Sequence, residues 1–233
     1  IIFVFSGVYT FRGKLHASVD KLGSNTIYVQ KWPWSFGDNY AWWKYVNRPE
    51  PSIRDFQSLK ERMENADGIT FEISTGNRTI KYRSGSVEGI NISAASQDFN
   101  KTWNFELQAG RYFTENENNN GTPVCLIGAE IAEGLFDNDN PIGKQVQILG
   151  RRVTVIGVFI KEGEDMLGTS LDKSVNIPIN FAKGILDIQN ERYNPQITVR
   201  GSENVSLEEV ESELRGVMRS IHRLRPNQED DFA

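Results

Sequence analysis

Apolar residues recur with helical spacing in three stretches of the chain. Residues 53–66 carry an apolar stripe three to four positions apart, directly after Ser52, a residue type that commonly caps helix N-termini. Residues 205–226 carry the strongest stripe, and Ser206 is followed three positions later by a glutamate, the spacing of a capping box. A shorter amphipathic stretch covers residues 11–22. These patterns predict two well-defined helices and one short helix.

Alternating or continuous apolar runs predict strands over much of the remaining chain. ITFEIS (69–74) and TIKYRS (79–84) both alternate, and the Thr75-Gly76-Asn77 segment between them predicts a hairpin. RRVTVIGVFI (151–160) is a nearly unbroken β-branched run, which is typical of a buried strand. SVNIPIN is also predicted as a strand, and Pro178 within it favours a place near a sheet edge. Further strands are expected at NTIYVQ, VEGINIS, KQVQILG and QITVRG.

The order of these elements separates two chain ends that resemble each other from a middle that differs. Residues 23–93 and 193–233 each combine strands with an amphipathic helix, whereas residues 94–192 are mostly β and rich in hairpins. We therefore predict an α+β fold, with one subdomain built from both ends and a β-rich subdomain inserted between them. The apolar opening within residues 1–22 suits either a buried first strand or the last turns of a membrane helix, since a complete span needs about 20 apolar residues.

Composition and charge narrow the class of protein. The chain has 233 residues, of which 38% are hydrophobic and 24% charged, as is typical of a folded domain with its own core. Its net charge of -5 comes from interspersed acidic and basic residues, so the sequence offers no basic stripe for a nucleic acid. The single cysteine, Cys125, lies in the apolar run PVCLIGA and is predicted to be a core residue.

The motifs of common enzyme and metal sites are missing from the sequence. It contains no GxSxG, P-loop or HExxH pattern. His16 and His222 have no second metal ligand at a useful spacing, and the acidic run DNDNP (137–141) is not followed by the bidentate glutamate of a calcium loop. We therefore predict that the chain is not an enzyme and has no catalytic, cofactor-binding or metal-binding residue.

One short segment concentrates most of the tryptophan. QKWPWSFGDNYAWWKY (30–45) holds four of the five tryptophans: Trp32, Trp34, Trp42 and Trp43. Such a cluster can be a stacking platform for sugars, a surface for a protein partner or cargo, or packing within the core. The position of the segment between a predicted strand and a predicted helix favours packing, and the four tryptophans are kept as a candidate partner or cargo surface.

Four segments of the chain resemble one family in its order of motifs. They are LGSNTIYVQ (22–30), LQAGRYFTENE (107–117), DNPIGKQVQILGRRVTVIGVF (139–159) and HRLRPNQEDDF (222–232). Together they resemble the periplasmic core domain of MacB-type ABC transporter permeases, in the MacB/FtsX-like permease family. The resemblance implies a porter-like subdomain from residues 23–93 and 193–233 and an inserted sabre-like subdomain from residues 94–192. It also implies that residues 1–22 are the end of a transmembrane helix and a stalk helix.

The same resemblance implies a function without chemistry in this domain. The expected role is that of an extracytoplasmic domain at the bacterial inner membrane, held by flanking transmembrane helices, that transmits ATP-driven motion to a periplasmic partner or cargo. ATP would be bound by a separate ATPase. The implied partners are that ATPase, through the membrane domain, and a periplasmic adaptor or a second permease protomer, with a dimer in the full-length transporter.

Two other functions remain open on sequence grounds. A carbohydrate-binding module would use the aromatic cluster from Trp32 to Trp43 as its stacking platform. An FtsX-like regulator would share the family resemblance but signal to a cell-wall hydrolase instead of moving cargo. In the aromatic segment the chain also departs from the MacB pattern, where a loop rich in glycine and serine is expected.

Overall fold

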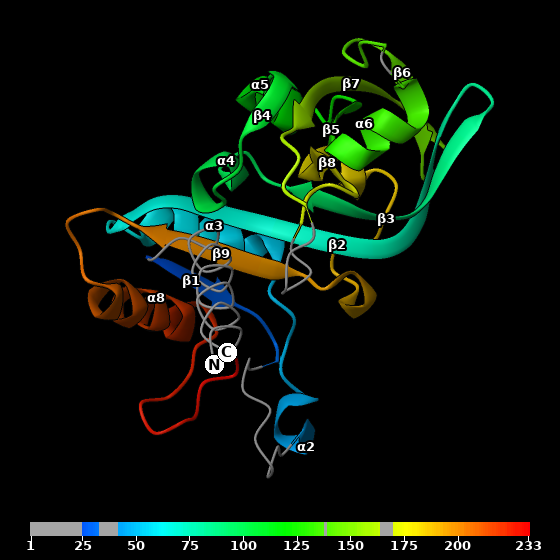
Figure 1. Cartoon of the computed structure of the whole chain (residues 1–233). Coiled ribbons are helices and arrows are strands. Elements are labelled where there is room, and N and C mark those ends of the chain that lie inside the picture. Colours follow the sequence, from blue (N-terminus) through cyan, green and yellow to red (C-terminus); the bar gives the residue numbers. More distant parts are fainter. Residues whose placement is uncertain (1–24, 33–41, 138, 164–169) are drawn as a thin grey trace, which may run out of the picture.

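One mixed sheet runs through the molecule, of which the computed structural model describes residues 25–32, 42–137, 139–163 and 170–233. The sheet has nine strands in the order β1-β9-β2-β3-β8-β5-β7-β4, with β6 paired to β2 and β7 (Figure 1). The strands are β1 (Thr26–Val29), β2 (Ala66–Tyr82), β3 (Gly85–Ala95), β4 (Leu107–Gly110), β5 (Val124–Ile127), β6 (Gln145–Ile148), β7 (Arg151–Phe159), β8 (Ser174–Pro178) and β9 (Gln196–Gly201). The helices are α2 (Trp42–Tyr45), α3 (Ile53–Arg62), α4 (Phe99–Thr102), α5 (Glu115–Asn119), α6 (Ala129–Phe136), α7 (Ile179–Lys183) and α8 (Leu207–Ile221), with a 3-10 turn η1 (Glu191–Tyr193).

The strands β2 and β3 form a long hairpin that connects the two regions of the sheet (Figure 1). The predicted hairpin at Thr75-Gly76-Asn77 is wrong, because β2 continues through this segment as a single strand. The segment forms an irregularity in the pairing with β3, and Asn77 takes a φ of 53°, a left-handed conformation that asparagine tolerates. The chain reverses later, after Tyr82, where Arg83 also has a positive φ.

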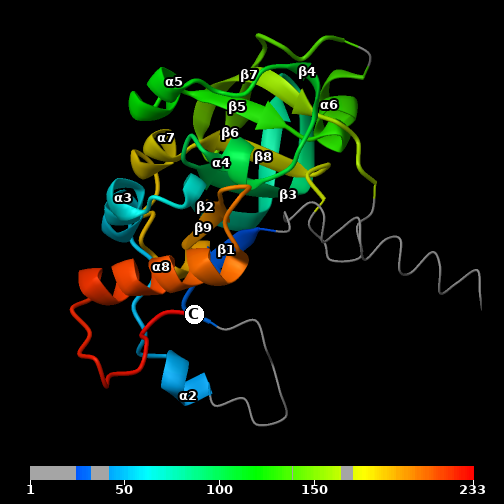
Figure 2. The ribbon, with the colours of Figure 1, turned by 90° about the vertical axis from the view of Figure 1, so that its left-hand side faces the viewer.

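Alternation along β2 gives its first half two chemically different faces. Phe71 points to the face covered by α3, where its ring lies 6.3 Å from that of Phe56. Figure 2 shows α3 and α8 next to each other on this side of the sheet. Thr70 and Glu72 point to the opposite face, and the Thr70 hydroxyl lies 2.8 Å from that of Thr102 in α4. The apolar face of the sheet is therefore closed by α3 and α8, and the polar face is approached by α4.

The helix α8 begins where the sequence predicts. The Ser206 hydroxyl accepts a hydrogen bond from the Glu209 amide, and the Glu209 carboxylate accepts one from the Ser206 amide, which completes the predicted capping box. Val210, Leu214 and Met218 form the buried face of the helix. The helix ends at Ile221, before the predicted end, and the chain then turns back along it. The other long helix, α3, also ends four residues before its predicted end, since β2 already begins at Ala66.

The capping box allows a simple test of the α8 boundary. Ser206→Ala is expected to lower the free energy of unfolding by about 1 kcal/mol, because the Glu209 amide loses its acceptor. Ser212→Ala is the matched control, since this serine is exposed inside the same helix and alanine there favours the helix slightly. Urea denaturation followed by circular dichroism measures both. Equal stability of the two variants would contradict the role of the cap.

The strand β8 corrects another expectation. Pro178 predicts an edge position, yet β8 lies between β3 and β5 in the sheet interior. The proline is compatible with this place because it is the last residue of the strand and also the N-cap of α7. The backbone N–H that Pro178 lacks is therefore missing only at the end of the strand, where the ladder of hydrogen bonds stops.

The hydrophobic core is formed by apolar residues of the strands and helices. Most of the fully buried side chains form one cluster that extends along the sheet, and a smaller cluster gathers around Phe113, Val124, Leu126 and Phe159. Cys125 is completely buried, and burial raises the pKa of its thiol. Its predicted role as a core residue is confirmed.

The α+β class is confirmed, since helices pack on both faces of a mixed sheet. The division into subdomains at residues 94 and 192 stays a prediction. The predicted membrane and stalk helix at residues 1–22 lies outside the described residues. Among the described helices, none has the length and hydropathy of a membrane span.

Candidate functional site

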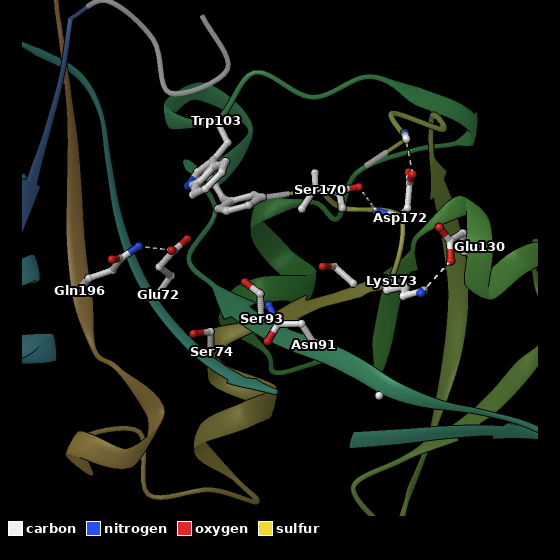
Figure 3. A pocket seen from close by; sticks show the side chains of 15 residues that line it. Glu72, Ser74, Asn91, Ser93, Trp103, Glu130, Ser170, Asp172, Lys173 and Gln196 are labelled. Atoms are coloured by element: carbon white, nitrogen blue, oxygen red, sulfur yellow. Dashed lines mark hydrogen bonds and ion pairs between the residues drawn. The ribbon is translucent and has the colours of Figure 1, made fainter. Parts of the chain in front are cut away.

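A groove of about 630 Å³ opens on the polar face of β2 and β3. It lies between these strands, the end of α4 and the segment that leads into β8 (Figure 3). Alternate residues of β2 and β3 supply its floor, which explains why the floor is polar although the opposite face is core. The side chains that the groove places together include Glu72, Ser74, Asn91, Ser93, Trp103 and Gln196.

Glu72 is the buried carboxylate of this groove. Its partner in the β2–β9 register is Gln196, whose side-chain amide donates a hydrogen bond to Glu72 Oε1. Burial raises the pKa of Glu72 to about 7, although the Gln196 amide and the nearby Trp103 indole both act to lower it. The indole does not reach hydrogen-bond geometry, so Glu72 Oε2 and Trp103 Nε1 are both buried without a partner. Such atoms are rare in folded proteins, and each needs an explanation.

Aromatic rings form one wall of the groove. The ring of Phe99 stacks on that of Trp103, with centroids 5.5 Å apart and an interplanar angle of 26°. Phe99 also stacks on Phe105 and Tyr112 on its other sides, at 5.7 Å and 6.5 Å between centroids. The wall is therefore held in place by packing and offers flat apolar surface beside the buried carboxylate.

The opposite wall carries charges that are already paired. Asp172 accepts hydrogen bonds from the backbone amides of Glu162 and Gly163, at 2.9 Å and 2.7 Å. Lys173 lies 3.3 Å from Glu130. Figure 3 shows these residues across the groove from Glu72. Among the described carboxylates of the groove, Glu72 is the one with a buried oxygen that has no hydrogen-bond partner.

A second cluster centres on His222, the C-cap of α8. Its Nδ1 lies 2.6 Å from Asp231 Oδ1 and its Nε2 lies 3.4 Å from Asp55 Oδ1. The hydrogen bond to Asp55, together with that to Asp231, raises the pKa of His222 to about 9 despite burial. Burial opposes ionisation of Asp55, but hydrogen bonds from His222 and Ser52 outweigh it and lower the pKa of that carboxyl.

The chain after α8 is fastened back onto the fold around this cluster, in a segment we call the tail clasp (residues 222–233). Arg219 donates hydrogen bonds to the Asp230 carboxylate and to the carbonyl of Gln228. The Ala233 amide donates a hydrogen bond to the Gln30 carbonyl, and the Gln30 amide donates one to the Ala233 carbonyl, both at 2.9 Å. The clasp thus joins the end of the chain to the segment that follows β1.

The structure describes only part of the candidate tryptophan surface. Trp43 is 59% exposed on α2, and Trp32 is half-buried with the Lys31 ammonium 5.6 Å from its ring centroid. Trp34 and the side chain of Trp42 lie outside the described residues. Neither Trp32 nor Trp43 is among the described residues that line the groove. The candidate partner surface therefore stays a prediction, as does the sugar-stacking alternative.

No sequence motif marks Glu72 or His222 as a functional residue. Glu72 occupies an ordinary polar position of an alternating strand, and its burial depends on α4 and β9. In the sequence, His222 is a histidine without a second metal ligand at a useful spacing, and the signal of its cluster is the pair of aspartates that follows it at Asp230 and Asp231. Among the described residues, no group of three or more histidine, cysteine, aspartate or glutamate side chains is arranged to hold a metal ion.

The sequence model of the MacB-like periplasmic core domain family matches residues 1–217 of the chain. The chain belongs to this family. The macrolide export ATP-binding/permease protein MacB of Vibrio parahaemolyticus is 25% identical over 210 residues, which is 88% of this chain and 30% of that protein. The pyoverdine export ATP-binding/permease protein PvdT of Pseudomonas aeruginosa is 26% identical over 153 residues, or 65% of this chain and 22% of that protein. The chain thus spans less than a third of these curated relatives.

Solved structures of MacB-like domains have the same fold. The periplasmic region of MacB from Actinobacillus actinomycetemcomitans matches with a TM-score of 0.70 at 20% identity, over 92% of this chain and 90% of that one. The extracellular domain of the noncanonic ABC-type transporter YknZ from Gram-positive bacteria matches with a TM-score of 0.66 at 20% identity, over 89% of this chain and 98% of that one. The resemblance drawn from the four sequence segments is confirmed.

Proposed function

We propose that this MacB-like periplasmic core domain belongs to an ABC transporter permease and transmits ATP-driven motion of the membrane helices to a periplasmic partner or cargo. The observation that carries the proposal is the fold match to the MacB periplasmic region over 92% of the chain. In this proposal the porter-like part comes from both chain ends and the sabre-like part from residues 94–192. Nucleotide binding belongs to a separate ATPase, and a second permease protomer completes the transporter.

Two features of the structure support a mechanical role. The nine strands form one continuous sheet, so a force applied at β1 reaches the distant strands through backbone hydrogen bonds. The tail clasp fastens the end of the chain to the segment after β1 through Gln30 and Ala233. Flanking membrane helices on both sides of the domain would therefore act on one rigid junction instead of on two loose linkers.

Spectroscopy on the full-length transporter tests the proposal. A spin label is attached to Glu88→Cys, an exposed position of β3, in both protomers of the transporter reconstituted with its ATPase. Cys125 is completely buried, so the native thiol should not take the label. Trapping the ATPase with nucleotide is expected to shift the distance between the two labels, measured by electron paramagnetic resonance. An unchanged distance distribution would refute motion transmission by this domain.

The tail clasp supplies the matching variant. Arg219→Gln removes the hydrogen bonds to Asp230 and to the tail carbonyls, and we expect ATP hydrolysis to continue while the label distances no longer respond to nucleotide. Arg151→Gln is the control, because this arginine is exposed at the start of β7, outside the clasp. A normal response in Arg219→Gln would show that the clasp does not couple the domain to the membrane.

A further inference from the structure

The groove has an unbalanced set of charges. Among the residues that the structure describes, three carboxylates line it, those of Glu72, Glu130 and Asp172, against the single ammonium of Lys173. Lys173 is paired with Glu130, and Asp172 is satisfied by two backbone amides. What remains is Glu72, whose Oε2 has no hydrogen-bond partner although it is buried. A donor that carries positive charge is the complement that this atom lacks.

The walls restrict the shape of that complement. Trp103 offers a flat, partly exposed apolar surface at the same end of the groove as Glu72 (Figure 3), and its ring stacks on the buried ring of Phe99. The floor adds hydroxyl and amide groups from Ser74, Ser93 and Asn91. A volume of about 630 Å³ lies within the range of small-molecule pockets and is large enough for one small molecule.

We propose that this groove is a binding site for a small organic cation, namely a primary ammonium group joined by a short linker to a flat ring. The ammonium group donates to Glu72 Oε2, and the ring packs against Trp103, which stacks on the buried Phe99 and whose aromatic face also attracts the positive charge. This site is independent of the proposed role in motion transmission, because it needs only the folded domain.

The charge state of Glu72 makes the site dependent on pH. Among the described residues, the other titratable groups that interact with Glu72 are Tyr28 of β1 and Tyr112, and burial, reinforced by the Glu72 charge, raises the pKa of both, so they stay neutral near pH 7. Asp98, near Tyr112, is already paired with Lys60 and Lys101.

The pKa of Glu72 is about 7, so its charge changes over the neutral pH range. Its ionised fraction rises from roughly a tenth at pH 6 to roughly nine-tenths at pH 8, so the affinity for a cation should rise about tenfold over this interval. A neutral ligand of the same shape should show no such rise. The affinity rises with pH because the carboxyl group must lose its proton before it binds the cation.

Isothermal titration calorimetry on the 233-residue chain tests the proposal with tryptamine and phenethylamine as probes. 3-Ethylindole serves as the neutral counterpart of tryptamine. Glu72→Gln keeps the shape of the side chain and removes its charge, and Glu88→Gln is the matched control because Glu88 is exposed and lies outside the groove. We expect at least one amine to bind, to bind at least tenfold more weakly to Glu72→Gln, and to bind equally to Glu88→Gln.

Several results would overturn the proposal. These are no binding of either amine up to millimolar concentration, equal binding by Glu72→Gln, equal binding of 3-ethylindole, or a flat affinity between about pH 6 and pH 8. The pH profile is measured on the unmodified chain, so the proposal can fail even if Glu72→Gln does not fold. The label distances in the full-length transporter test motion transmission separately, so either proposal can fail while the other stands.

Discussion

Gly128→Ala is expected to lower the free energy of unfolding by about 3–5 kcal/mol, because the turn between β5 and α6 has no room for a side chain. A Cβ atom at this position would lie 2.1 Å from the carbonyl oxygen of Asp172 and 2.2 Å from that of Leu171. Both contacts are backbone atoms, so no side-chain rotation relieves them. The Gly128 amide also donates to the Ser174 carbonyl at 2.8 Å, which holds the two segments together.

Gly216→Ala provides the opposite expectation within the same chain. Gly216 lies inside α8, and a Cβ atom there would meet nothing within 4 Å. Alanine favours a helix over glycine, so this variant should gain about 0.5–1 kcal/mol. Urea denaturation of both variants and the unmodified chain measures the difference. A Gly128→Ala variant within about 1 kcal/mol of the unmodified chain would refute close packing at this turn.

The Gly128 contact also matters for the groove. Asp172 and Leu171 line the groove, and Glu130 beyond the turn pairs with Lys173. A shift of the turn would therefore move the charged wall away from the aromatic wall. The position of the charged wall thus depends on the contact of Gly128 with a segment some forty residues later in the chain. The pattern of apolar residues in the sequence does not predict this contact.

Locally determined features were predictable from the sequence. The capping box of Ser206 and the buried position of Cys125 depend on residues within a few positions, and both are confirmed. The hairpin expected at Thr75-Gly76-Asn77 fails because turn-forming residues also suit a bulge, and pairing with β3 decides between them. The edge position predicted from Pro178 is wrong for a similar reason. The proline is tolerated because it is the last residue of β8, although the strand itself lies inside the sheet.

The site could be predicted less well, because it depends on pairings between distant residues. Glu72 becomes a buried carboxylate only when β9 places Gln196 beside it and α4 brings Trp103 over it. The alternation of ITFEIS does predict that Glu72 faces away from Phe71. It does not predict that the polar face is covered, since α4 is only four residues long and has no amphipathic stripe.

His222→Gln is expected to lower the free energy of unfolding by about 2–3 kcal/mol near neutral pH, because two carboxylates would lose their cation. The folded-state pKa of His222 is about 9, above its ordinary value of 6.5. Its contribution is therefore complete below about pH 6.5 and is lost as the pH rises through about 9. Asp55 acts in the opposite direction: its pKa is lowered, so its contribution is present above its ordinary value and is lost as the pH falls.

The contribution of His222 and its two carboxylates should therefore be level in mildly acidic to neutral solution and decline on each side. Glu72, with its raised pKa of about 7, lowers the stability of the unmodified chain and of His222→Gln alike as the pH rises from its ordinary value of 4.5 towards neutrality. Urea denaturation at intervals between about pH 5 and pH 9.5 measures the curve for the chain and for His222→Gln. The variant should lose most of the alkaline decline, so the two curves should converge as the pH approaches 9.5. Asp231→Asn is the partial control, because it removes the partner at 2.6 Å and leaves Asp55 in place, which should shorten the alkaline decline without abolishing it. A variant whose stability declines as steeply as that of the unmodified chain above pH 7 would show that His222 does not hold the tail clasp by its charge.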